Sequence, residues 1–438
     1  MRLILTHEEF SILFRAVLDF YHVIFDNLFN VLLLITVVLS FIYLVISLYA
    51  ILSKKWKKAE YVFSEKDAPF VTVQIPTRNE LAAIQCAKNC LNFDYPKDRY
   101  EIIIGDDSND NAISKRLDEF AKSEEMVKIT RRGENTGYKA GNLNHMLKFS
   151  KGEVIVLFDS DFTPSRDFLK RIVAPFINDK NVSAVQAKWN SVNANQNIIS
   201  VLGSTIIAIC HQIVLPFVYR KRNFSFLCGS AEAVKKDLLI KMGGWKEGSL
   251  TEDIEYSLRL LKGGNRIVYL EDLGCDGEVP HKAKDLYRQQ MRWAYGVVSA
   301  FKEHGGGIIT NKKLSIEDKA YAYLTVSGYA MSFLLMGLFL TGFISFITHK
   351  PETINFVKFF SELGINVLLT SGLVITAIAA QSMSKNTRSI PSMIASFFSY
   401  GLIVVYYVNK GIFRVVFNKP MQWYLLNKNA NFFFLVKK

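Results

Sequence analysis

Two acidic residues stand one position apart at the end of an apolar run near the middle of the chain. The run Val154–Phe158 is typical of a short strand buried on both faces, and Asp159 and Asp161 follow it directly. In open α/β sheets, ligands bind beyond the carboxyl ends of the strands, where these two carboxylates would emerge. Paired carboxylates suit a hard divalent cation, Mg²⁺ or Mn²⁺, although an ordinary solvated turn has the same pattern.

Two more polar clusters follow apolar runs earlier in the chain. Residues 71–75 and 101–105 are predicted as buried strands, and residues 81–91 as the helix between them. The segment 76–80 follows the first strand, and Asp106 and Asp107 follow the second. An alternation of strand and helix predicts a parallel sheet of βαβ units, so the three clusters should meet at one edge.

A glycine-rich segment, residues 132–142, lies between the second and third clusters. Its glycines allow tight turns, and Lys139 offers a cation for a phosphate group. The spacing is not that of a Walker A loop, and an ordinary loop leading into a helix would also fit.

An acidic segment, Leu250–Glu255, follows two glycines and a tryptophan. Asp253 is a candidate general base if it lies beside an acceptor hydroxyl. The structural alternative is a plain helix start, because Ser249 and Glu252 have capping-box spacing and acids are favourable in a first helical turn.

A polar and aromatic group follows near the end of the soluble part. Gln289, Arg292 and Trp293 would share a helix face at positions i, i+3 and i+4. Together they suit a phosphate group and the apolar face of a sugar. Arginine and tryptophan are equally common as anchors at a membrane interface, so both interpretations stay open.

Half of the 438 residues are hydrophobic, and the apolar runs concentrate before residue 53 and after residue 319. Uncharged runs there approach the roughly 20 residues that cross a bilayer. The sequence therefore predicts a soluble insert between membrane segments. The predicted parts are an amphipathic interfacial segment (1–26), a transmembrane helix (27–52), a soluble domain (53–305), an interfacial link (306–319), C-terminal spans (320–410) and a basic tail at the membrane surface (411–438).

The formal net charge of +13 does not indicate a nucleic-acid partner, because no zinc, helix-turn-helix or RNA-binding pattern accompanies it. Much of the excess positive charge flanks the apolar runs. The lysine-rich segment 54–58 predicts that the soluble domain is cytoplasmic and close to anionic membrane lipid, whereas the basic tail leaves the number of C-terminal spans open. Five cysteines without Cys-x-x-Cys spacing predict free thiols in a reducing compartment.

These motifs, in this order within a membrane-anchored α/β insert, resemble those of the family 2 glycosyltransferases. The resemblance is narrower to the cellulose synthase, hyaluronan synthase and mannan synthase superfamily, and it covers residues 70–300. It implies an α/β fold of the GT-A type, inserted between an N-terminal transmembrane helix and a C-terminal transmembrane bundle. It also implies a nucleotide-diphosphate sugar donor, with UDP or GDP as the nucleotide.

The resemblance also implies roles for individual residues. Asp159 and Asp161 would hold the metal, and Asp253 would be the general base, with Glu252 and Asp161 completing the catalytic group. The residues implied to bind substrate are Thr77, Glu80 and Asp107 at the nucleoside with Asp106 in support, Lys139 at the base and diphosphate, and Gln289, Arg292 and Trp293 at the diphosphate and acceptor end.

The expected function is an inverting hexosyl transfer, because one base and no carboxylate nucleophile suffice for a single displacement. The leading expectation is a processive synthase in the plasma or inner membrane, which elongates a β-linked glycan and extrudes it. One alternative is transfer of a single sugar to a lipid. A second, from another class, is a transporter with a nucleotide-binding domain.

Overall fold

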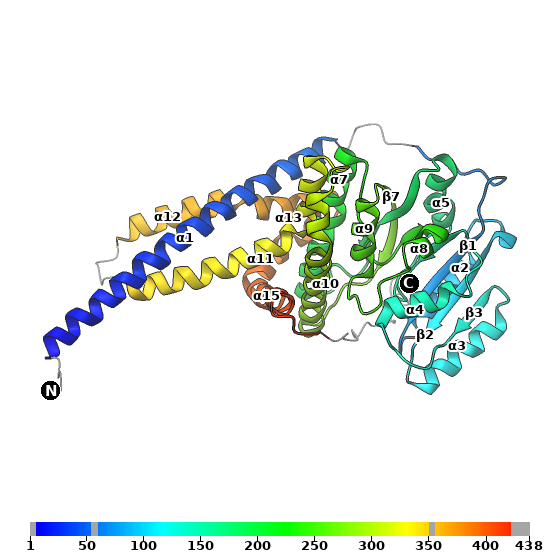
Figure 1. Cartoon of the computed structure of the whole chain (residues 1–438), viewed down its shortest axis with the longest axis horizontal. Helices are drawn as coiled ribbons and strands as arrows, with labels where there is room; N and C mark the ends of the chain where they lie inside the picture. The colour runs from blue at the N-terminus through cyan, green and yellow to red at the C-terminus, as the bar shows by residue number, and fades with distance from the viewer. Residues whose placement is uncertain (1–5, 54–59, 350–354, 422–438) are drawn as a thin grey trace.

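The computed structural model of the chain describes residues 6–53, 60–349 and 355–421. The lysine-rich segment 54–58 and most of the basic tail lie outside the described residues. Figure 1 shows a sheet domain at one side and long helices that extend away from it at the other. The chain thus has the predicted division into an α/β part and an apolar helical part.

A seven-stranded sheet forms the centre of the α/β part, in the order β3-β2-β1-β4-β6-β5-β7. Strand β6 runs antiparallel to both of its neighbours, and the other pairs are parallel. The sheet is therefore mixed and not purely parallel. Its strands are β1 (Val71–Thr77), β2 (Tyr100–Asp106), β3 (Val127–Thr130), β4 (Val154–Leu157), β5 (Val182–Ser191), β6 (Glu232–Lys235) and β7 (Arg266–Gly277).

Helices cover both faces of this sheet because its strands bury side chains on both sides. Ile102 and Ile104 of β2 belong to one apolar core, whereas Ile103 between them belongs to the other. The elements beside the sheet are α2 (Ala82–Leu91), η2 (Lys97–Arg99), α3 (Asn111–Ser123), α4 (Tyr138–Leu147), α5 (Phe168–Asn178), α8 (Lys236–Lys241) and α9 (Glu252–Lys262). The strands and the helix predicted around residues 71–105 are confirmed.

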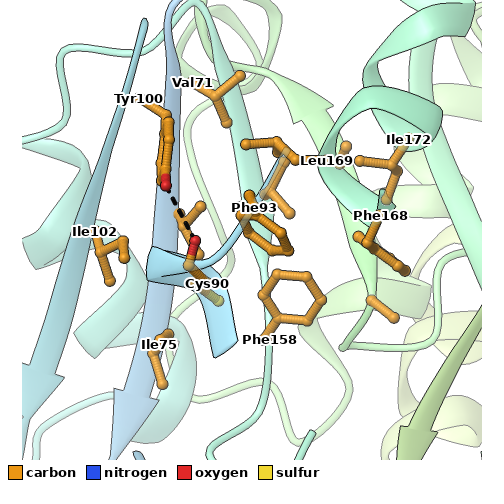
Figure 2. Close-up of a cluster of buried hydrophobic side chains, with 14 of the residues drawn as sticks. Val71, Ile75, Cys90, Phe93, Tyr100, Ile102, Phe158, Phe168, Leu169 and Ile172 are labelled. Atoms are coloured by element: carbon orange, nitrogen blue, oxygen red, sulfur yellow. Dashed lines mark hydrogen bonds between the residues drawn. The ribbon is translucent and has the colours of Figure 1, made fainter. Parts of the chain in front are cut away.

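The first of these cores holds β4 and its two acids in place. Figure 2 shows Phe158, the residue before Asp159, between Phe93 and Phe168. The ring centroid of Phe158 lies 6.3 Å from that of Phe93 and 5.1 Å from that of Phe168. Phe158 is fully buried, so the backbone that leads into the acidic pair is anchored by aromatic packing.

The apolar helices form the second part of the chain. Within the described residues, four are long and apolar enough to cross a membrane, or five if the bent pair α12 and α13 is one span. The elements are α1 (His7–Leu52), α6 (Ile198–Ala208), η3 (Ile209–Val214), α7 (Leu215–Arg222), α10 (Ala283–Thr310), α11 (Ile316–Thr348), α12 (Phe356–Thr370), α13 (Gly372–Met383), η4 (Thr387–Ser389), α14 (Ile390–Ser396), η5 (Phe397–Gly401) and α15 (Leu402–Val416).

The structure differs from the predicted organisation at two boundaries and at one apolar segment. Helix α1 continues without a break across the boundary predicted between residues 26 and 27, and α10 extends to Thr310 into the predicted link. The apolar stretch Ile198–Arg222 was not predicted as a span, and 67% of its most apolar window is buried inside the protein. Hydropathy reports how apolar a helix is, but not whether lipid or protein covers it.

Replacing Phe158 with Ala tests the aromatic anchor. Because a buried ring is removed, we expect a loss of about 3–5 kcal/mol of unfolding free energy. The matched control is Phe149→Ala, since the Phe149 side chain is 50% exposed and should change stability by less than about 0.5 kcal/mol. Thermal unfolding of both full-length variants measures this, and equal losses would contradict the packing described.

Candidate active site

A cavity of about 310 Å³ lies at the carboxyl edge of the parallel strands. The predicted site residues that line it come from six separate segments of the chain. They are Thr77, Glu80, Asp107, Lys139, Asp159, Asp161, Glu252, Asp253, Gln289, Arg292 and Trp293. The structure therefore brings together all the predicted site residues except Asp106, which lies outside the lining.

Asp106 holds the loop after β2 instead. Its carboxylate accepts from Ser114 Oγ at 2.7 Å, from the Ser108 amide at 3.0 Å and from Arg131 Nε at 2.8 Å. Burial alone would raise the pKa of Asp106, but the hydrogen bonds from Ser108 and Ser114 and the Arg131 ion pair hold it below its usual value. This supporting place agrees with the secondary role expected for it.

Asp107 lines the cavity and is fixed by an arginine that sequence reasoning did not single out. Arg132 donates from Nε and Nη2 to the two carboxylate oxygens of Asp107, at 2.9 and 2.6 Å. This bidentate pair joins the loop after β2 to the glycine-rich segment. Arg132 stood within that predicted segment, but no spacing rule connected it to Asp107.

Glu80 connects the loop after β1 to the acidic pair. Thr77 Oγ1 donates to the Glu80 carbonyl at 3.1 Å, and Ser160 Oγ donates to the Glu80 carboxylate. Because Ser160 stands between Asp159 and Asp161, this bond aligns the first and third polar clusters. These contacts show that the first and third polar clusters meet at one edge of the sheet, as predicted.

Lys139, in the first turn of α4, is the central cation of the site. Its Nζ lies 2.7 Å from Asp159 Oδ1 and 3.3 Å from Glu252 Oε1, and it donates to the Gly229 carbonyl at 2.5 Å. Burial would lower the pKa of Lys139, but the carboxylates of Asp159 and Glu252 hold it above its usual value. The lysine is therefore charged and holds three segments together.

The Gly229 turn requires glycine for two reasons. Its φ of +85° lies in the left-handed region, and a Cβ there would approach Asp253 Oδ2 to 3.3 Å and Lys139 Nζ to 3.4 Å.

Glu232, at the start of β6, accepts from the Gly229 amide at 2.8 Å. Burial and the Asp253 charge raise the pKa of Glu232 to about 8.

Asp253 lies in the first turn of α9. The described residues do not form the capping box that the spacing of Ser249 and Glu252 offered as the structural alternative. Ser249 Oγ accepts from the Thr251 amide at 3.3 Å, while Glu252 pairs with Lys139. Burial and the neighbouring Glu252 charge raise the pKa of Asp253 to about 7, although Lys139 opposes the shift. A carboxylate with this pKa is suited to accept a proton near neutral pH.

Helix α10 presents Gln289, Arg292 and Trp293 to the cavity, so the three share a face as predicted. Arg292 Nη1 donates to the Leu250 carbonyl at 3.0 Å, just before the acidic segment. These side chains lie on the cavity side of α10.

Two glycines allow the close packing of α10 with its neighbours. A Cβ on Gly296 would come within 2.5 Å of the Thr251 side chain at the start of α9. A Cβ on Gly411 of α15 would come within 2.5 Å of the Met291 carbonyl of α10. Helix α10 therefore touches the acidic segment on one side and a candidate span on the other.

Asp159 and Asp161 fit a hard divalent cation. Both line the cavity, and both offer carboxylate oxygens, which Mg²⁺ and Mn²⁺ prefer. The side chain of Asp159 is 33% exposed and its partner Lys139 is already in contact, so the cation would share Asp159 with the lysine.

The cavity is also lined by residues that the sequence analysis did not single out. Trp189, Asn190 and Ser191 of β5 line it, and Glu278 and Val279 follow β7. Apolar side chains of the long helices line the cavity as well: Ile206, Ile207, Val297 and Tyr329. One cavity thus has a charged end at the sheet and an apolar end at α6 and α11.

A mixed sheet with acids at its carboxyl edge, an arginine and tryptophan on a following helix and apolar flanking helices defines a GT-A architecture, which confirms the predicted fold class. The chain belongs to the glycosyltransferase-like family 2, whose sequence model matches residues 68–296. The resemblance stated from the motifs is thereby confirmed.

Two of the curated proteins to which the chain is similar come from plants. A probable glucomannan 4-β-mannosyltransferase of Arabidopsis thaliana is 30% identical over 277 residues, covering 61% of this chain and 50% of that protein. A second, from Oryza sativa subsp. japonica, is 30% identical over 263 residues, covering 58% of this chain and 46% of that protein. The chain thus spans about half the length of these relatives.

A solved structure shares the fold over most of the chain. It is the mannosyltransferase PcManGT from Pyrobaculum calidifontis, in complex with GDP-Man and Mn²⁺. The TM-score is 0.58 at 18% sequence identity, and the match covers 85% of this chain and 99% of that one. The likeness therefore includes the apolar helices as well as the sheet domain.

Gly229→Ala tests whether the turn positions the charged groups. The added Cβ should displace Lys139 or Asp253 and reduce sugar transfer by roughly tenfold or more. Gly133→Ala is the matched control, because Gly133 has a similar φ of +80° but nothing within 4 Å of its Cβ position. Both should cost about 1–2 kcal/mol of stability, and equal transfer rates in the two variants would contradict the role of the turn.

Proposed function

We propose that the chain is a membrane-integrated, metal-dependent, inverting glycosyltransferase that transfers a hexose from a nucleotide-diphosphate sugar to a glycan or glycolipid acceptor. The observation that carries this proposal is the convergence of Lys139, the acidic pair and Asp253 on one cavity. GDP-mannose is the favoured donor, because the plant relatives bear the name of mannosyltransferases and the Pyrobaculum structure contains GDP-Man.

The charges in the cavity suit displacement of a nucleoside diphosphate. Bound at Asp159 and Asp161, Mg²⁺ or Mn²⁺ would offset the negative charge that develops on the leaving group. Lys139 and Arg292 supply fixed positive charge on the same cavity. Thr77, Glu80 and Asp107 lie at the end of β1 and β2, where the nucleoside would bind.

Asp253 is the proposed general base. It takes the proton from the acceptor hydroxyl while that oxygen attacks the anomeric carbon from the face opposite the diphosphate. This single displacement inverts the anomeric configuration, so an α-linked donor gives a β-linked product. Glu252 keeps the pKa of Asp253 high and pairs with Lys139, which makes it a positioning residue in this mechanism.

The acceptor is proposed to enter between Trp293 and the apolar end of the cavity. A β-linked glycan, as the names of the plant relatives suggest, could stack on Trp189 and Trp293. A glycolipid is the second candidate, and the apolar lining at Ile206, Ile207 and Tyr329 favours it, since that lining suits an acyl or prenyl chain.

Extrusion of a glycan is the less favoured part of the proposal. Helix α12 has no buried residue in the described part of the chain, and Figure 1 shows only α1, α11 and α12 extending farthest from the sheet domain. A helix without a buried residue does not enclose a path for a sugar, so the packing of α12 does not support extrusion. The soluble domain is proposed to lie on the cytoplasmic side, where nucleotide sugars are available.

Asp253→Asn tests the base. We expect transfer to fall by about 10²–10⁴-fold with donor binding retained, because only proton removal is lost. In the wild type, the base works when deprotonated, so kcat/KM should rise as the pH rises through about 7. The matched control is Asp237→Asn, an exposed acid in the first turn of α8. Unchanged turnover in Asp253→Asn would leave the mechanism without its base.

Chelation tests the metal. We expect EDTA to reduce transfer by about 10²-fold or more, because the leaving-group charge is no longer offset. Added Mn²⁺ or Mg²⁺ should restore the wild type but not Asp161→Asn. Full activity in the presence of the chelator would refute metal dependence.

Product analysis tests stereochemistry and acceptor class together. Purified protein in lipid is given labelled GDP-mannose, UDP-glucose or UDP-N-acetylglucosamine, and the product is examined by NMR and by size. We expect a β-configured linkage, and an α-configured one would refute inversion. A long water-soluble product indicates a polysaccharide synthase, whereas a single sugar extracted with lipid indicates glycolipid synthesis.

A further inference from the structure

Three soft ligand side chains meet in the cavity wall between the charged and apolar ends. They are Cys210, His211 and Cys228, and one ligand atom of each lies within 4.8 Å of the other two. All three line the cavity. The proposed transfer uses none of them, and the sequence alone predicted only free thiols.

The π-helical segment η3 places two of these ligands side by side. Cys210 and His211 are consecutive residues of η3, whose wider turn brings successive side chains closer in direction than an α-helix does. Short π-helical segments within α-helices are frequent at functional sites. Cys228 reaches the same point from the loop before β6, so the cluster joins two separate segments.

The imidazole of His211 is held in a fixed orientation. It stacks on Trp189 with ring centroids 5.1 Å apart and an interplanar angle of 26°. Nδ1 lies 3.3 Å from Tyr269 Oη, and the same hydroxyl donates to the His211 carbonyl at 2.6 Å. The Trp189 amide also donates to Nδ1 at 3.5 Å, so these contacts fix the orientation of the ring.

The surroundings of Cys228 favour a cation. The hydrogen bond with Cys210, burial, and the charges of Asp253 and Glu232 all raise the pKa of the Cys228 thiol. The cluster therefore lies beside two acidic side chains, Asp253 and Glu232. Displacing one proton from each thiol with a divalent cation leaves the net charge of the cluster unchanged, which suits a half-buried position.

We propose that Cys210, His211 and Cys228 bind a soft divalent cation such as Zn²⁺, at a site separate from the carboxylate pair Asp159 and Asp161. Two thiolates and an imidazole are the ligands Zn²⁺ prefers, and three protein ligands leave a fourth position for water from the cavity. Ligand atoms around tetrahedral Zn²⁺ lie about 3.5–3.8 Å apart, so small side-chain rotations complete the site. Binding releases two protons, one from each thiol.

Cobalt titration of the full-length, metal-free protein under reducing conditions tests the site. We expect a thiolate-to-cobalt charge-transfer band in the near ultraviolet that saturates with one Co²⁺ at this site and is lost when Zn²⁺ displaces the cobalt. Cys210→Ser or Cys228→Ser should weaken binding by at least about tenfold, and the double variant should lose the band. Asp161→Asn should keep it. No band, or a band in the double variant, overturns the proposal.

A second measurement needs no variant and no transfer activity. Zn²⁺ should slow alkylation of Cys210 and Cys228, identified by mass spectrometry, while Cys86, Cys90 and Cys275 react at unchanged rates because they are buried elsewhere. Equal rates with and without Zn²⁺ overturn the proposal even if the variants fail to fold. Both readouts are independent of sugar transfer, so they separate this site from the proposed function.

Discussion

The contacts of the buried ammonium of Lys139 are the interaction on which the site depends. It faces Asp159, Glu252 and the Gly229 carbonyl, which come from the end of β4, the start of α9 and the turn before β6. Buried carboxylates are unfavourable without a compensating charge, and removing one partner of such a group is strongly destabilising. The same lysine limits the rise in the pKa of Asp253 to about 7, because its positive charge opposes the effects of burial and of the Glu252 charge.

The cavity combines two environments that a soluble enzyme seldom needs together. At the sheet, strand ends and helix starts collect charge around the diphosphate position. At α6 and α11, apolar side chains line the same space. Because α10 supplies Arg292 to the first and Val297 to the second, a single helix aligns the donor end with the acceptor end. The lining of the cavity is therefore a property of the apolar helices as much as of the sheet domain.

The motifs could be read from the sequence because buried strands are short apolar runs and their carboxyl ends meet at one edge. Asp107 and Asp159 follow from that rule, whereas Lys139 was predicted from the glycine-rich segment that contains it. Glu232 does not follow from the rule, because β6 is reversed and its first residue, not its last, reaches the site. Cys210 and His211 could not be predicted as part of the cavity either. Hydropathy shows neither that a turn is π-helical nor that Ile198–Arg222 is largely buried inside the protein.

The two glycine contacts of α10 have a mechanical consequence. Gly411 brings α15 against the backbone of α10 at Met291, and Gly296 brings α10 against Thr251. The first contact is made by a backbone carbonyl and the second by the short Thr251 side chain, so a displacement of α15 that keeps its contact also moves Arg292 and Trp293 of α10. Membrane spans tilt when the hydrocarbon thickness around them changes. The packing of α15 on α10 thus links a candidate membrane span directly to the lining of the cavity.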